Sequence, residues 1–253
     1  MLRTFIERST HRIVIRRHLP PPFSAATIYA SSEGRLRYLG PSMDAVDPTL
    51  LRLAAELVRP GNVVWDIGSN LGLFSLAASV SAGSRGRVIA VEPDTAIVSL
   101  LRRSVAANHG NSPVDVLPVA VADKVGVAQF HVARRNRSTS YLDGFGTKQT
   151  GGVRTTVMVP TVTLDWLAAQ FPSPDIIKID VEGAELQVLA GGNQVLRELP
   201  TVVCEVANHN AAAVAELLRG YGYMIHDGEE LPAQRTPLRL APPNTLALVG
   251  PRS

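Results

Sequence analysis

The sequence predicts an α/β protein: a doubly wound, Rossmann-like, mostly parallel sheet with helices on both faces. Short apolar runs that suit buried strands alternate along the chain with segments whose apolar residues recur at helical spacing. The connections between successive strands are long enough for crossover helices, which parallel pairing requires. The last two predicted strands, 224–226 and 245–249, have no helix between them, so this pair is expected to be antiparallel.

The N-terminal part, residues 1–45, is expected to stand apart from the main domain at 46–253. Residues 26–39 alternate between apolar and polar, which predicts a hairpin with its turn at 31–34, covering one edge of the cofactor or substrate site. A proline run at 20–22 separates this hairpin from a basic arm, which would be a membrane-surface helix, a partner-binding helix, or an arm packed on its own or a neighbouring subunit. A homodimer is therefore one expectation. The basic residues of the arm are Arg3, Arg8, Arg12, Arg16 and Arg17.

The elements of the main domain follow from apolar periodicity and capping residues. Asp47 and Pro48 predict the start of a helix that ends before Pro60, and Asp94 predicts the cap of another. Residues 134–152 show no period and are expected to form a lid or a plain surface loop. Strands are expected at 63–67, 87–91, 114–117, 127–132, 153–162, 176–180 and 201–206.

Composition excludes several classes of protein. The net charge is only +3 and the basic residues are not gathered into one long basic face, so nucleic acid is not expected as a partner. The single cysteine, Cys204, excludes an internal disulfide and lies in an apolar run that suits a buried strand. No apolar run approaches the roughly 18 residues of a membrane span. The N-terminus lacks the apolar core of a signal peptide, and a cytoplasmic protein is predicted.

A glycine loop follows the strand expected at 63–67. In open α/β sheets, ligands bind beyond the carboxyl ends of the strands, and glycines allow a close approach to the backbone. A dinucleotide fingerprint would need glycine where Asn70 and Leu73 stand, and no Walker A lysine follows. An acid followed by G-x-N-x-G is similar to the loop of S-adenosylmethionine-dependent methyltransferases; the alternative is a glycine turn without a ligand. The similarity implies cofactor contacts by Asp66, Gly68, Ser69, Asn70, Gly72 and Phe74.

Acids end three of the predicted strands: Asp66, Glu92 and Asp180. An acid at the end of the second strand can accept both hydrogen bonds of a ribose diol, and Glu92, followed by Pro93, suits that role. The alternative for Glu92 is a solvated carboxylate. Ala122 and Asp123, after the third strand, are expected to meet the adenine edge, although Asp123 could equally be a turn residue.

The run Lys-Ile-Asp-Val-Glu-Gly-Ala-Glu at 178–185 resembles the signature of the FkbM-type methyltransferases. Segments 66–72, 88–93, 162–165 and 204–206 are similar to that family in the same order, and together they cover about residues 47–210. The resemblance implies S-adenosylmethionine as cofactor and methylation of a hydroxyl group in a polyketide macrolide or a sugar. It also implies a serine-rich cofactor contact, here Ser138 and Ser140.

The catalytic candidates come from the same signature. Lys178 shares a strand face with Asp180 and needs a carboxylate partner, for which Asp66, Asp180 and Glu205 are candidates; a structural ion pair and a catalytic role both remain open. A hydroxyl acceptor needs a base within hydrogen-bond reach, and the candidates are Asp180 and Glu205, then His209, together with Glu182. No His or Cys spacing indicates a metal site.

Two other functions share the predicted fold. A nicotinamide-dependent oxidoreductase would use the same ribose acid, but the missing glycines at 70 and 73 argue against it. A non-catalytic S-adenosylmethionine-binding protein would keep the cofactor residues and lack turnover.

Overall fold

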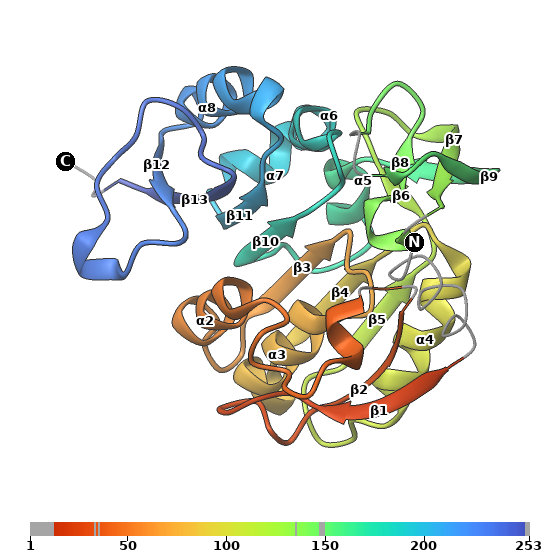
Figure 1. The fold of residues 1–253 in the computed structure, drawn as a ribbon. Coiled ribbons are helices and arrows are strands. Elements are labelled where there is room, and N and C mark those ends of the chain that lie inside the picture. The colour runs from red at the N-terminus through yellow and green to blue at the C-terminus, as the bar shows by residue number, and fades with distance from the viewer. Residues whose placement is uncertain (1–12, 33, 35, 135, 147–149, 251–253) are drawn as a thin grey trace.

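The computed structural model describes residues 13–250 apart from 33, 35, 135 and 147–149. Its centre is a seven-stranded sheet with the order β12-β13-β11-β10-β3-β4-β5 (Figure 1). The neighbours from β11 to β5 are parallel, and β13 lies antiparallel between β11 and β12. The doubly wound prediction is confirmed, including the antiparallel pair at the end. The strands are β3 (Val63–Ile67), β4 (Arg87–Val91), β5 (Val114–Leu117), β10 (Ile176–Ile179), β11 (Thr201–Glu205), β12 (Tyr223–Asp227) and β13 (Asn244–Val249).

One face of the sheet packs against four short helices. Trp65, Ile89 and Ile177 point to this face, and each is essentially inaccessible to water. Buried leucines of the helices, such as Leu164 and Leu196, complete this part of the core. The helices are α5 (Leu164–Ala168), α6 (Glu185–Ala190), α7 (Asn193–Arg197) and α8 (Ala211–Gly220).

The opposite face packs against α2 (Pro48–Leu57), α3 (Leu73–Ala82) and α4 (Thr95–Ala106). Asp47 caps α2 by accepting a hydrogen bond from the Leu50 amide at 3.0 Å, and Asp94 caps α4 in the same way. Both predicted caps are confirmed. The switch in strand order lies between β10 and β3, where α/β sheets bind their ligands.

The N-terminal hairpin is paired differently from the prediction. Its strands are β1 (Val14–His18) and β2 (Thr27–Ser31), so the proline run lies in the connection between them. A turn does follow β2, where the Gly34 amide donates to the carbonyl of Ser31 at 3.2 Å. The predicted second strand is wrong, because the residues from Leu36 to Leu39 form the 3-10 helix η1. Phe23 and Ile28 are buried in the core cluster with α3, and the Tyr29 amide donates to Ser104 Oγ of α4. The hairpin therefore belongs to the main core. Residues 1–12 of the predicted basic arm lie outside the described residues.

The structure contains a second sheet, which the sequence did not predict as a sheet of its own. It lies beside the carboxyl ends of the strands of the main sheet (Figure 1). Its order is β6-β9-β7-β8, with β7 and β9 antiparallel over nearly their whole length. Phe130 and Val132 of β7 are buried beneath it. The strands are β6 (Ala120–Val121), β7 (Gly126–Ala133), β8 (Tyr141–Leu142) and β9 (Val153–Val162).

None of the helices within the described part of the chain combines the length and the apolar character that crossing a membrane requires.

Candidate active site

The glycine loop joins β3 to α3 and is tied to the neighbouring strand. The amides of Gly68 and Ser69 both donate to the carbonyl of Val91, at 2.9 and 3.0 Å. Gly68 has φ of +75°, and a Cβ there would lie 1.8 Å from the carbonyl oxygen of Asp180. Glycine is thus required at position 68 because two strand ends meet there. Asn70 also has a positive φ, of +49°.

Beneath the loop lies a buried ion pair. Lys178 and Asp66 are opposite each other on parallel strands, and Lys178 Nζ is 3.1 Å from Asp66 Oδ1 and 3.7 Å from Asp180 Oδ2. The same ammonium donates to the carbonyl of Gly68 at 2.7 Å, while Ser75 Oγ donates to Asp66 Oδ2 at 2.5 Å. Burial alone would lower the pKa of Lys178, but the carboxylates of Asp66 and Asp180 raise it above its ordinary value. Lys178 therefore remains a cation that fixes the loop.

Glu92 follows β4 and faces the same loop. Its carboxylate accepts hydrogen bonds from the Asn70 amide at 3.0 Å and from the Asp94 amide at 2.9 Å. Burial raises the pKa of Glu92 to about 7, against the opposing effect of the Asp94 amide. Two bonds leave acceptor capacity on a carboxylate, which offers about four lone-pair sites. Glu92 can therefore bind further donors.

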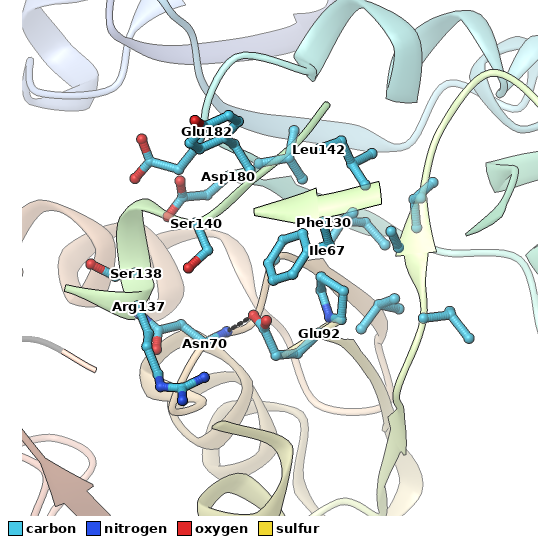
Figure 2. A pocket seen from close by; sticks show the side chains of 18 residues that line it. Ile67, Asn70, Glu92, Phe130, Arg137, Ser138, Ser140, Leu142, Asp180 and Glu182 are labelled. Carbon is cyan, nitrogen blue, oxygen red and sulfur yellow. Dashed lines mark hydrogen bonds between the residues drawn. The ribbon is translucent and has the colours of Figure 1, made fainter. Parts of the chain in front are cut away.

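A cavity opens above these residues (Figure 2). Its polar residues come from the glycine loop, from Glu92, from the segment after β7 and from the turn after β10. Its apolar side is built by Phe130 and Leu142 of the second sheet together with Val121. The predicted residues that line it are Gly68, Asn70, Glu92, Pro93, Ser138, Ser140 and Asp180.

Other predicted cofactor residues lie elsewhere. Asp66 is wholly buried in the ion pair with Lys178. Ser69 and Phe74 line a smaller adjoining pocket, and Gly72 forms the start of α3. Ala122 and Asp123 do not line the cavity; residues 119–121 do, because the chain bends into β6 before reaching them.

A second, more open groove adjoins the cavity. It shares Ser138, Asp180 and Glu182 with the cavity, so the two spaces meet at these residues. The predicted catalytic residues Glu205 and His209 line the groove, and both are exposed. Lys178 is beneath the loop instead and lines neither space.

The floor of the groove is held by a buried carboxylate that the sequence analysis did not select. Glu185 accepts from the Gly183 amide at 2.6 Å and from Asn210 Nδ2 at 2.7 Å. Asn210 Nδ2 also donates to the carbonyl of Gly183 at 2.9 Å. This network joins the 180–185 turn, where Glu182 has φ of +53°, to the segment that carries His209.

The cavity is also lined by Phe130, Arg137 and Leu142, which the sequence did not identify as site residues. The alternation of apolar and polar residues from Ala128 to Val132 could have placed Phe130 on the inner face. Nothing in the local sequence indicates that the segment after β7 folds back over β4. Arg137 Nη1 lies 2.8 and 2.7 Å from the two carboxylate oxygens of Asp94.

The cavity and the smaller pocket beside it offer hydrogen-bonding groups that suit S-adenosylmethionine. Buried oxygens of Ser69, Asn70 and Ser138 have no hydrogen-bond partner within the described part of the chain, and such atoms normally find one. Glu92 offers acceptor sites for a ribose diol, and the Phe130 side offers an apolar surface for a base. No cluster of three or more potential metal-ligating side chains occurs among the residues that the structure describes.

The fold and the cavity define a doubly wound enzyme that binds a nucleoside-containing cofactor. The methyltransferase FkbM domain matches residues 66–225, more than half of the chain, and this protein belongs to that family of S-adenosylmethionine-dependent methyltransferases. Its curated relatives include 31-O-demethyl-FK506 methyltransferase FkbM of Streptomyces tacrolimicus, 28% identical over 80% of this chain and 87% of the relative. Hexuronic acid methyltransferase AglP of Haloferax volcanii is 29% identical over 62% of this chain and 61% of its own length.

The solved structures with some similarity to this chain are more distant. The tRNA (uracil-54, C5)-methyltransferase of Pyrococcus abyssi, in complex with S-adenosyl-L-homocysteine, has a TM-score of 0.46 and 16% identity, covering 92% of this chain and 43% of its own. Precorrin-6y C5,15-methyltransferase of Geobacter metallireducens has a TM-score of 0.43 and 16% identity, covering 83% and 88%.

Proposed function

We propose that this protein transfers a methyl group from S-adenosylmethionine to a hydroxyl oxygen of a small molecule, either a sugar or a polyketide-type secondary metabolite. The observation that supports this most is the junction of the two spaces at Ser138, Asp180 and Glu182. A cofactor in the cavity and an acceptor in the groove would meet there. The names of the two relatives, a hexuronic acid methyltransferase and a methyltransferase of 31-O-demethyl-FK506, indicate the two acceptor classes to test.

The cofactor supplies an electrophilic methyl group, so the chain's own residues have to orient the acceptor and remove its hydroxyl proton. Asp180 already contacts the ammonium of Lys178 at 3.7 Å. Glu205 and His209 are exposed in the groove proposed for the acceptor, so we rank them first as the general base, with Glu182 next. Asp180 would instead orient groups at the junction, and Asn210 and Glu185 would hold the groove in shape.

The first experiment is calorimetry of S-adenosylhomocysteine with the wild type, Glu92→Gln and Glu216→Gln. Glu216 is exposed on α8, so its variant is the control. Micromolar binding that only Glu92→Gln weakens supports the cofactor assignment. Absence of wild-type binding with an intact circular dichroism spectrum contradicts it, and binding of NAD instead would favour the oxidoreductase.

The second experiment is a methyl-transfer assay that measures S-adenosylhomocysteine release over a panel of hydroxylated sugars and macrolides. Turnover is expected on at least one acceptor, with kcat reduced at least a hundredfold by substitution of the base, since general-base catalysis contributes about 10²–10⁴. The pH–rate profiles of Glu205→Gln and His209→Gln identify which residue it is. Cofactor binding without turnover on any acceptor would favour a non-catalytic binding protein.

A further inference from the structure

One short segment separates the cavity from the groove. We call residues 136–142 the shared wall. Ser138 lines both spaces, Asn136 and Thr139 line the groove, and Ser140 and Leu142 line the cavity. A displacement of this wall would change both spaces at once.

The shared wall has little regular structure. It consists of the 3-10 helix η3 (Arg137–Thr139) and the two residues of β8, which pair with β7. Two of its hydrogen bonds are local: Asn136 Oδ1 accepts from the Ser138 amide at 3.0 Å, and Ser140 Oγ accepts from the Ala133 amide at 3.1 Å. Such short elements do not hold a fixed position without a tertiary contact.

Arg137 supplies a tertiary contact to the main domain. Its Nη1 bridges both carboxylate oxygens of Asp94, and the exposed fractions of the two side chains are 16% and 3%. A charge-assisted hydrogen bond shielded from water is stronger than an exposed ion pair. The contact joins the wall to the first turn of α4.

Asp94 in turn contacts the residue proposed to bind ribose. Its carboxylate caps α4 by accepting from the Ala96 amide at 3.0 Å, and its own amide donates to Glu92 Oε1 at 2.9 Å. Glu92 Oε2 accepts from the Asn70 amide of the glycine loop. A continuous chain of contacts therefore runs from the loop through Glu92 and Asp94 to Arg137, whose neighbourhood is shown in Figure 2.

We infer that Arg137 is a positioning residue of the methyl-transfer reaction. Its ion pair with Asp94 fixes the shared wall, so cofactor retention and acceptor alignment both depend on this ion pair. The inference rests on the proposed function. Arg137 acts through the position of Ser138 and its neighbours. Its loss should therefore raise both the dissociation rate of the cofactor product and the KM of the acceptor.

The test is a double-mutant cycle with Arg137→Gln and Asp94→Asn. Asparagine at position 94 keeps an oxygen that can cap α4, so this variant removes the charge while preserving the helix start. Each single variant is expected to raise the dissociation rate of S-adenosylhomocysteine on the order of tenfold, and the double variant no further, since both remove the same contact. Arg137→Lys should restore part of the effect. Arg134→Gln, an exposed position just before the wall, is the matched control.

Two further readouts separate the inference from simpler explanations. The acceptor KM should rise more than kcat falls, and the melting temperature should change little, because the wall is local. Unchanged dissociation rates and KM in both single variants, or a loss of melting temperature with normal binding, overturns the inference. Failure of the wild type to bind S-adenosylhomocysteine overturns the proposed function instead, so the two failures are distinguishable.

Discussion

Binding of S-adenosylhomocysteine is expected to release a proton from Glu92 near neutral pH. Burial raises the pKa of this carboxyl to about 7 in the free protein, so about half of the molecules carry the proton at pH 7 and about nine-tenths at pH 6. Two ribose hydroxyls can both donate only to the ionised form, and binding would lower the pKa. The expected release is about 0.5 proton per site at pH 7 and about 0.9 at pH 6.

The affinity should follow the same titration. Below pH 7 the proton must be removed before the diol binds, so affinity falls about tenfold per pH unit, and above pH 7 it is constant. Calorimetry in buffers of different ionisation enthalpy measures the released protons directly. Equal binding enthalpies across those buffers at pH 6 would refute the role of Glu92. The Glu92→Gln variant should bind weakly, with no proton release and no pH dependence in this range.

The stability of the free protein has the opposite pH dependence. The pKa of Glu92 is about 7 in the folded chain against an ordinary value of 4.5, so ionisation favours the unfolded state. The penalty is absent well below pH 4.5, grows as pH rises to 7 and is constant above. The shift corresponds to about 3 kcal/mol at 1.36 kcal/mol per pKa unit. Urea unfolding of the wild type relative to Glu92→Gln checks this; a difference independent of pH would contradict it.

Three further substitutions test the supports of the site. Gly68→Ala should abolish cofactor binding and lower the melting temperature, because the added Cβ would lie 1.8 Å from the Asp180 carbonyl; normal binding would contradict this geometry. Lys178→Met should lower the unfolding free energy by about 3–5 kcal/mol, because it leaves the buried charge of Asp66 uncompensated. The double variant Lys178→Met, Asp66→Asn should recover part of this loss in urea titrations. Asp47→Ala should cost about 1 kcal/mol through the lost cap of α2, and Asp47→Asn much less, by thermal unfolding; equal losses would show that the cap is not the cause.

The strands of the main sheet could be predicted because their sequence signals are local. Val63 to Trp65 is an apolar run followed by Asp66, and the largely apolar strand Ile176–Ile179 is followed by Asp180. The caps at Asp47 and Asp94 have strong residue preferences. Likewise, a lysine inside an apolar strand required a buried acid. The sequence left three candidates for this partner, and the structure shows contacts to two of them, Asp66 and Asp180.

What could not be predicted depends on pairing between distant residues. The strand that pairs with β2 is β1, which precedes a proline run that suggested a domain boundary. The hairpin that they form is held against α4 by the hydrogen bond from the Tyr29 amide to Ser104. The second sheet forms because β9 returns to β7 and β6, which moves the cavity edge from Ala122 to Val121. The contact of Arg137 with Asp94 spans 43 residues and has no local signature.

The position of β13 between β11 and β12 also constrains the order in which the chain can fold during synthesis. β12 leaves the ribosome before β13, yet its only pairing in the main sheet, within the described residues, is with β13. Until residues 244–249 are available, β12 has no sheet neighbour, and the outer edge of β11 stays unpaired and prone to non-native association. Completion of this half of the sheet is therefore a late, non-local step, and such steps are intrinsically slow.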